Sequence, residues 1–256
     1  MQRRKFIQIC VAGSSANAAC LAAQAHANSP ASPVKAGGPA TPVTETPLAE
    51  KRYARVKLVD PDGKAIKGAS LKANHNYVFH YPFASTPCFL LKLDKAAAAK
   101  SPLKSEAGGL YASVGGVGGQ KSIVAYSAIC AHKMAYPTKQ VSFISYRADA
   151  RVGSAATTRA KVIACCADKS VYDPAQGARV VSGPAPQPLA TILLEHDAKT
   201  DELYAVGTLG GEKFDAFFEK YEFKLSLEMG ARARERVTGT VTLSDLTAFS
   251  SQTARC

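Results

Sequence analysis

Two short segments of the chain hold side chains that transition metals prefer as ligands. The first contains Cys130 and His132, and on an extended or turning loop both could face one metal. The second contains Cys165, Cys166 and Asp168. Thiolate, imidazole and carboxylate groups are all metal donors. The pattern therefore predicts a metal site built from two loops.

A proline-rich loop, Gly183-Pro184-Ala185-Pro186, follows the second segment. Two Cys/His loops followed by such a loop resemble the Rieske iron–sulfur proteins, whose pattern is Cys-x-His, then Cys-x-x-His, then Gly-Pro-Ala-Pro. The resemblance covers roughly residues 55–225 and extends to the small subunit of arsenite-oxidase-type molybdenum enzymes. It implies a [2Fe–2S] cluster, in which two Cys hold one iron and two His hold the other.

The chain departs from this pattern at the fourth ligand. When the sequences are aligned on Ser170, Asp168 stands where the second His belongs, and a register shifted by one residue offers Lys169. The other candidate imidazoles are far away in sequence and could reach the site only through the fold: His75, His80 and His196. Three outcomes stay open: Asp168 ligates iron, Cys166 joins the ligands, or the chain binds no cluster.

The first outcome gives the metal ligands Cys130, His132, Cys165 and Asp168, with Cys166 as the alternative fourth ligand. A carboxylate is a harder donor than imidazole and carries negative charge, so it should lower the reduction potential relative to two Cys and two His. Respiratory-type members also have a disulfide that ties the two loops together. Here its positions are Ala135 and Ala167, so that disulfide is absent.

The resemblance also assigns residues to the surroundings of the cluster. Ser170 and Tyr172 correspond to hydrogen-bond donors to sulfur, which raise the potential. Pro184 and Pro186 preset the backbone of a lid over the loops. The complete set of expected surrounding residues is Lys133, Ser170, Tyr172, Gly183, Pro184 and Pro186.

Short strands with Gly and Pro punctuation must position these loops. Apolar and β-branched runs predict strands at 55–59, after Gly63, and at 77–81, 88–93, 122–126, 141–146, 161–164, 191–194 and 202–206. Phe214, Phe217, Phe218 and Tyr221 share one face of a short helix at 212–221. The fold class is therefore all-β, and the resemblance implies a Rieske-type antiparallel β-sandwich with a two-loop cluster-binding subdomain and one short helix.

The start of the chain has the features of an export signal. Arg3 and Arg4 precede a mildly apolar stretch and a small-x-small cleavage site at Ala25-His26-Ala27. We therefore expect a twin-arginine signal peptide at 1–27, a flexible linker at 28–50, a Rieske domain at 51–225 with cluster loops at 127–136 and 163–189, and a basic, polar extension at 226–256. The expected location is the periplasm, and the expected membrane contact is at most an uncleaved signal.

Composition and motifs argue against a nucleic-acid-binding protein and against an enzyme with its own catalytic residues. The net charge is +12, which favours acidic partner surfaces, but the Lys and Arg are scattered without a nucleic-acid recognition motif. No nucleophile–base–orienter set is apparent, so no catalytic residue is assigned. We expect a [2Fe–2S] protein that carries single electrons between a catalytic subunit, with a molybdenum enzyme as one candidate, and a redox partner. The alternative is a cluster-free docking subunit that keeps the fold.

Overall fold

The computed structural model describes residues 47–149 and 159–256. The expected signal peptide at 1–27 lies outside the described residues, and so does the expected linker as far as residue 46. The account of the fold that follows therefore concerns the strand-rich part of the chain, which contains every expected metal ligand.

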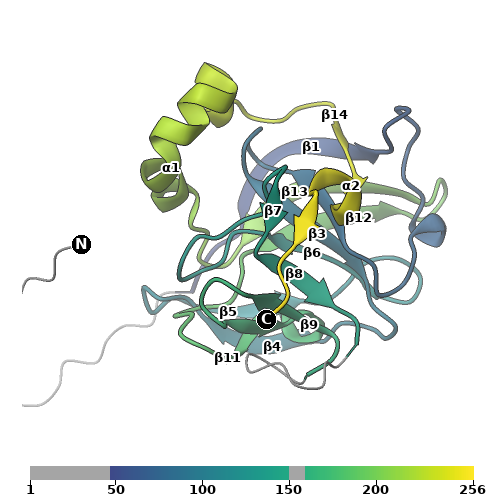
Figure 1. The fold of residues 1–256 in the computed structure, drawn as a ribbon. Coiled ribbons are helices and arrows are strands. Elements are labelled where there is room, and N and C mark those ends of the chain that lie inside the picture. Colours follow the sequence, from purple (N-terminus) through teal and green to yellow (C-terminus); the bar gives the residue numbers. More distant parts are fainter. Residues whose placement is uncertain (1–46, 150–158) are drawn as a thin grey trace, which may run out of the picture. The chain divides into compact units, whose positions relative to one another are not determined.

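The largest sheet has eight strands in the order β14–β1–β13–β12–β6–β3–β2–β15 (Figure 1). In that order the strands are Thr240–Thr242, Lys51–Val59, Glu202–Leu209, Thr191–Asp197, Ile123–Ser127, Pro87–Lys92, Tyr77–His80 and Ser244–Asp245. Neighbouring strands pair antiparallel, except that β14 runs parallel to β1. Strand β6 lies inside this sheet and leads directly into the first expected ligand loop.

A second sheet carries the second expected ligand loop. Its four strands are β11 (Arg179–Ser182), β10 (Val171–Asp173), β9 (Val162–Cys165) and β8 (Ile144–Arg147), in that order. Two smaller pairs complete the strands: β4 (Ala99–Lys104) with β5 (Leu110–Val114), and β7 (Val141–Ser142) with β16 (Gln252–Thr253). Strands dominate the described chain, which confirms the all-β prediction.

The two larger sheets share a hydrophobic core. Phe89 and Tyr126 of the large sheet pack in one cluster with Ile163 and Tyr172 of the small sheet, and all four are buried. Because side chains alternate along a strand, Leu90, next to Phe89, belongs to a separate cluster with residues of β1 and β13. Cys130 and Cys165 are members of the shared core, so the two ligand loops start from its edge.

One longer helix, α1, spans Phe214–Met229 and confirms the helix expected at 212–221, although it ends later. Its backbone departs from helical geometry at Tyr221, where the expected helix ends. Phe217 and Phe218 are buried against Ile129, which belongs to the first ligand loop. The remaining helices are short: α2 (Leu246–Phe249) and the 3-10 turns η1 (Gly68–Ser70), η2 (Pro174–Gln176) and η3 (Gly230–Arg234).

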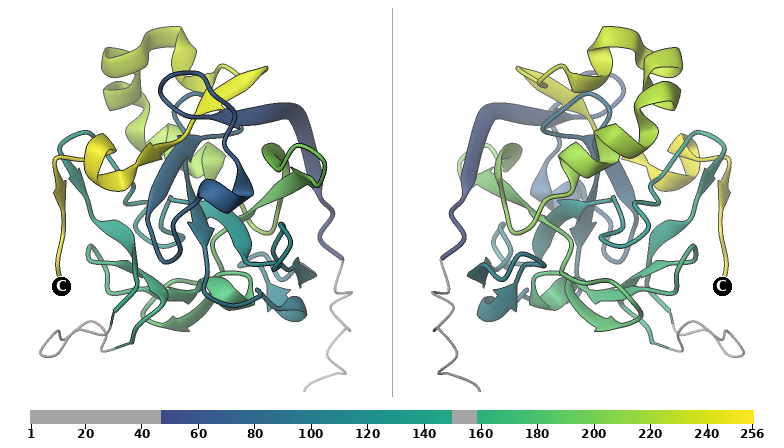
Figure 2. Two further views of the ribbon diagram at one scale, coloured as in Figure 1. Left: turned by 90° about the vertical axis from the view of Figure 1, so that its right-hand side faces the viewer. Right: turned by 90° about the vertical axis from the view of Figure 1, so that its left-hand side faces the viewer.

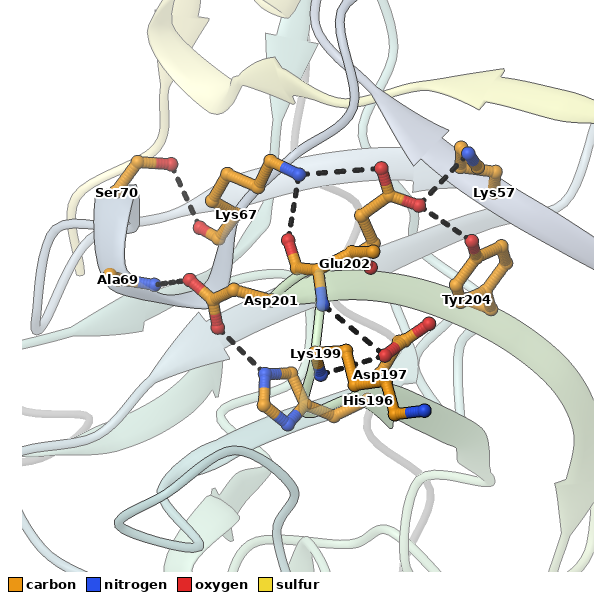
Figure 3. Close-up of polar contacts among 11 residues, drawn as sticks. Lys57, Lys67, Ala69, Ser70, His196, Asp197, Lys199, Asp201, Glu202 and Tyr204 are labelled. Atoms are coloured by element: carbon orange, nitrogen blue, oxygen red, sulfur yellow. Dashed lines mark hydrogen bonds and ion pairs between the residues drawn. The ribbon is translucent and has the colours of Figure 1, made fainter.

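The strand expected after Gly63 does not form. Residues 64–70 make isolated bridges and the turn η1 instead. The turn between β12 and β13 holds them, because the Asp201 carboxylate accepts from the Ala69 amide at 2.8 Å and contacts the His196 ring at 2.7 Å (Figure 3). These side-chain contacts add to isolated backbone hydrogen bonds, from the Ile66 amide to the Leu58 carbonyl and from the Gly68 amide to the Asp201 carbonyl, both at 2.9 Å.

The neighbouring Glu202 extends this polar network. Its carboxylate contacts Lys57 at 2.9 Å and Lys67 at 3.3 Å and accepts from the Tyr204 hydroxyl at 2.7 Å (Figure 3). The hydrogen bonds from Tyr204 and Lys57 lower the pKa of Glu202 to about 2. Residues 64–70 are therefore attached to the large sheet by the ion pair between Lys67 and Glu202 and by the hydrogen bond from the Ala69 amide to Asp201.

The residues after 225 continue the same fold. The expected boundary at 225/226 falls inside α1, and the chain then adds β14 and β15 to the two edges of the large sheet. Next, β16 pairs with β7. Figure 2 shows this last part of the chain in yellow, ending at the label C. Among the described residues, no helix has the length and apolar character needed to cross a membrane.

Candidate metal centre

The first ligand loop follows β6 and folds back on itself. The Cys130 amide donates to the Ala135 carbonyl at 2.9 Å, and the Met134 amide donates to the Cys130 carbonyl at 2.9 Å. Met134 adopts a left-handed φ of 54°, which closes the turn. This arrangement buries Cys130 completely and leaves His132 at the outer side of the loop.

The second ligand loop joins β9 to β10 as a tight hairpin. The Cys165 amide donates to the Ser170 carbonyl at 2.8 Å, and the Lys169 amide donates to the Cys165 carbonyl at 2.8 Å. Lys169 has a left-handed φ of 64°. The Ser170 amide also donates to Oδ1 of Asp168 at 2.9 Å. This last bond fixes the Asp168 side chain and leaves its other oxygen for the first loop.

The two loops meet at that oxygen. Oδ2 of Asp168 lies 3.2 Å from Cys130 Sγ and 3.0 Å from His132 Nδ1. The donor atoms of Cys130, Cys165 and Asp168 all lie within 4.8 Å of one another. Across residues 47–149 and 159–256, this is the only group of three or more such side chains with metal-site spacing. His132 reaches the group through Asp168.

Exposure divides the site into a buried side and an open side. Cys130 and Cys165 are fully buried, and only 2% of the Asp168 side chain is exposed. The His132 side chain is 36% exposed. A metal held here is therefore shielded by protein around the thiols and approached from solvent past the imidazole.

The two buried thiols influence each other's ionisation. The hydrogen bond with Cys165 lowers the pKa of Cys130. The same hydrogen bond raises the pKa of its other member, Cys165, and burial raises it further. A pair of thiols this close gives up one proton readily and retains the second, because two adjacent thiolates repel each other. A metal cation would remove that repulsion and stabilise both thiolates.

The Asp168 carboxyl is held in its charged form. Burial acts to raise its pKa, but hydrogen bonds from the Ser170 amide and the Cys130 and Cys165 thiols outweigh it, so the pKa of Asp168 lies below the usual range. An ionised carboxylate is the form that binds metal. Asp168 is therefore ionised, which is the form that can ligate a metal or pair with the His132 ring.

Two hydroxyl groups lie in the wall of the site. The Tyr172 hydroxyl is 3.3 Å from Cys130 Sγ and accepts from the Ala131 amide at 3.2 Å. The Ser170 hydroxyl is buried and has no hydrogen-bond partner among the described residues. An unsatisfied buried hydroxyl costs about 1–3 kcal/mol, so this position suits an additional acceptor, such as a sulfide. Both residues stand where the resemblance places donors to sulfur.

Gly183 of the proline-rich loop lies directly on the second ligand loop. A Cβ at Gly183 would come within 2.5 Å of the Lys169 carbonyl oxygen and the Ser170 Cα. Pro184 and Pro186 are exposed, and their expected role as a lid over the loops stays a prediction. The exposed Lys133 accepts through its carbonyl from Lys220 of α1 at 2.6 Å.

Gly183→Ala is expected to destabilise the second ligand loop. Its φ of +88° is unfavourable for Ala by about 1–2 kcal/mol, and the added methyl group meets the Lys169 and Ser170 backbone. The midpoint of urea unfolding should fall, and amide exchange at residues 165–170 should accelerate. Gly108→Ala is the matched control, because its φ is +89° and nothing lies within 4 Å of a Cβ there. Equal midpoints for the two variants would contradict the expected close contact.

The other expected candidates lie elsewhere. Cys166 forms a disulfide with Cys256, so in this state it offers no free thiolate to the site. Adjacent residues at a strand end point to opposite faces, which separates Cys166 from the inward Cys165. The remaining described histidines do not reach the site: His75 contacts Asp245, His80 lies against Phe249, and His196 contacts Asp201. Sequence reasoning assigned no role to Cys256, because no spacing pattern indicates a pair of cysteines 90 residues apart.

Comparison with known proteins returned no matching family model. Among solved structures, the chain is similar to the soluble domain of the Rieske protein II (soxF) from Sulfolobus acidocaldarius. The sequence identity is 25%, the alignment covers 62% of this chain and 82% of that one, and the TM-score is 0.40.

Proposed function

We propose that the protein binds a [2Fe–2S] cluster and carries single electrons. The observation that carries this proposal is the convergence of two buried thiols, a carboxylate and an imidazole from two loops. In this proposal Cys130 and Cys165 hold one iron, and His132 and Asp168 hold the other. When bound, such a cluster supplies a one-electron redox centre.

The donor set and its surroundings fit this group. The thiols provide the soft ligands that iron–sulfur clusters require, and the unpaired Ser170 hydroxyl and the Tyr172 hydroxyl offer hydrogen bonds to sulfur. Burial of the thiols limits access of water and oxidants. The partly exposed His132 gives a partner protein the shortest approach to the site.

The proposed partners are a catalytic subunit that donates electrons and an acceptor protein. A molybdenum enzyme of the arsenite-oxidase type is the candidate donor, on the strength of the sequence resemblance alone. The proposed location is the periplasm, because the twin-arginine route exports folded proteins that already contain their cofactors. The exposed side of the site bears Lys133 and Lys169, which would favour an acidic partner surface.

A second candidate function is a cluster-free docking subunit. One observation favours it: Asp168 already pairs with Cys130, His132 and the Ser170 amide, so much of the polar site is satisfied within the protein. A fold that needs no metal to satisfy these groups could persist after losing a cluster.

Iron and acid-labile sulfide per chain decide between the two functions. The protein should be produced with its assembly machinery and purified without oxygen, and a reduced-state EPR spectrum should be recorded. About two irons and two sulfides with a rhombic signal would support the electron carrier. A folded protein with neither would overturn it and favour the docking subunit. A single iron without sulfide would also contradict a [2Fe–2S] centre.

A further inference from the structure

The two ligand loops are supported from outside in different ways. The first loop packs against α1: Ile129 and Tyr136 join a hydrophobic cluster with Phe217, and the Tyr136 and Phe217 ring centroids are 4.9 Å apart. Lys220 adds a hydrogen bond to the Lys133 carbonyl. Hydrophobic packing of a helix therefore holds the first loop.

The tip of the second loop has no such packing. Ala167 and Lys169 are exposed, and none of residues 166–169 belongs to a hydrophobic cluster of the described chain. The Cys166 amide donates to the Phe143 carbonyl at 2.6 Å. The strongest remaining connection is the covalent bond between Cys166 and Cys256, whose Cα atoms are 5.5 Å apart.

The segment that brings Cys256 to the loop is itself well anchored. Gln252 and Thr253 pair with Val141 and Ser142, and the Ala254 amide donates to the Ser142 carbonyl at 2.8 Å. In Figure 2 this yellow segment is the last part of the chain before the end labelled C. The buried Arg147 lies against both sulfurs, 2.9 Å from Cys166 Sγ and 2.7 Å from Cys256 Sγ.

We infer that the Cys166–Cys256 disulfide is a positioning clamp for the second ligand loop. It holds the residue between two proposed ligands, directly after Cys165 and two positions before Asp168. A cross-link at this point limits opening of the hairpin, and so keeps the Asp168 carboxylate facing Cys130 and His132. The ligand roles rest on the proposed function, whereas the restraint on the loop does not.

Two single variants distinguish the effect of losing the disulfide from the effect of a newly freed thiol. Cys166→Ser and Cys256→Ser both break the same bond, but only Cys256→Ser leaves a free thiol beside Cys165. Native-state hydrogen exchange should be followed at the Cys165 and Lys169 amides, which close the hairpin, and at the Cys130 and Met134 amides of the first loop.

Both variants should accelerate exchange of the Cys165 and Lys169 amides by about tenfold or more, and leave the first loop unchanged. Both should also shift the reduction potential of the bound cluster in the same direction. Breaking the disulfide of the folded natural chain with a dithiol reductant should have the same effect on exchange, which keeps the test valid if a variant fails to fold.

Three results would overturn the clamp: unchanged exchange in both variants, equal acceleration in both loops, or an effect confined to Cys256→Ser. The last result would assign the effect to the free Cys166 thiol. If the natural protein contains no iron, the proposed function fails, but the exchange measurement on the same chain still tests the clamp.

Discussion

Cys165→Ser is expected to remove the cluster from the protein while leaving the strands intact. Serine is a much poorer ligand for iron than thiolate. The neighbouring Cys130 is already a proposed ligand, and Cys166 cannot replace Cys165 because it is bonded to Cys256. Iron and sulfide per chain should fall by about tenfold or more, with loss of the visible absorption bands. Far-ultraviolet circular dichroism would confirm that the strand content is unchanged.

Cys88→Ser is the matched control for this prediction. Cys88 is another free, fully buried cysteine, and its Sγ donates to the Tyr81 carbonyl at 3.0 Å, a bond that a serine hydroxyl can also make. It lies in β3, outside the group formed by Cys130, Cys165 and Asp168. This variant should retain its iron. An unchanged spectrum in Cys165→Ser would show that Cys165 is not a ligand.

Asp168→His is expected to raise the reduction potential of the bound cluster. Imidazole is neutral where the carboxylate carries a negative charge, so the oxidised, more positive state loses its stabilisation. The increase should be on the order of 100 mV, a fraction of the range that separates clusters with two His ligands from those with four Cys ligands. Redox titration followed by EPR measures it directly.

The control for Asp168→His must remove a negative charge from the same hairpin without touching the donor group. Asp173→Asn does so, because Asp173 accepts from the Ala175 amide at 2.9 Å and starts the turn η2. Its effect on the potential should be much smaller. If the two variants shift the potential equally, Asp168 acts through general electrostatics. If Asp168→His leaves the potential unchanged, the carboxylate is not a ligand.

The strands that sequence predicted are those with continuous or alternating apolar side chains. Runs such as Cys88–Leu91 and Ile123–Tyr126 are buried on both faces, so their composition alone indicates strand. The pair β4 and β5 was missed because Ala99–Lys104 is polar and contains a proline, which argues against a strand. After Gly63 the chain makes isolated bridges and the turn η1 in place of the expected strand, and Asp201, distant in sequence, contacts this segment.

The sequence was sufficient to predict which residues could be donors in the candidate site, but not how these residues are arranged in space. Residue types indicated Cys130, His132 and Cys165 as metal-binding candidates, and the resemblance added Asp168. Spacing could not reveal that Asp168 lies within hydrogen-bonding distance of both Cys130 and His132. The partner of Cys166 was hidden for a similar reason. Cys256 is 90 residues away, and its approach depends on pairing between β16 and β7.

If the protein is exported with a cluster as proposed above, the Cys166–Cys256 bond also implies an order of events in maturation. Disulfides do not persist in a reducing cytoplasm, so a chain that folds there has an unlinked second loop. The proposed cluster would be inserted at that stage, while the hairpin is free to open around it. Oxidation after export would then close the bond over a site already loaded. In this order of events, the disulfide forms only after the cluster has been inserted. A chain exported without a cluster would form the same disulfide, which would hinder later insertion.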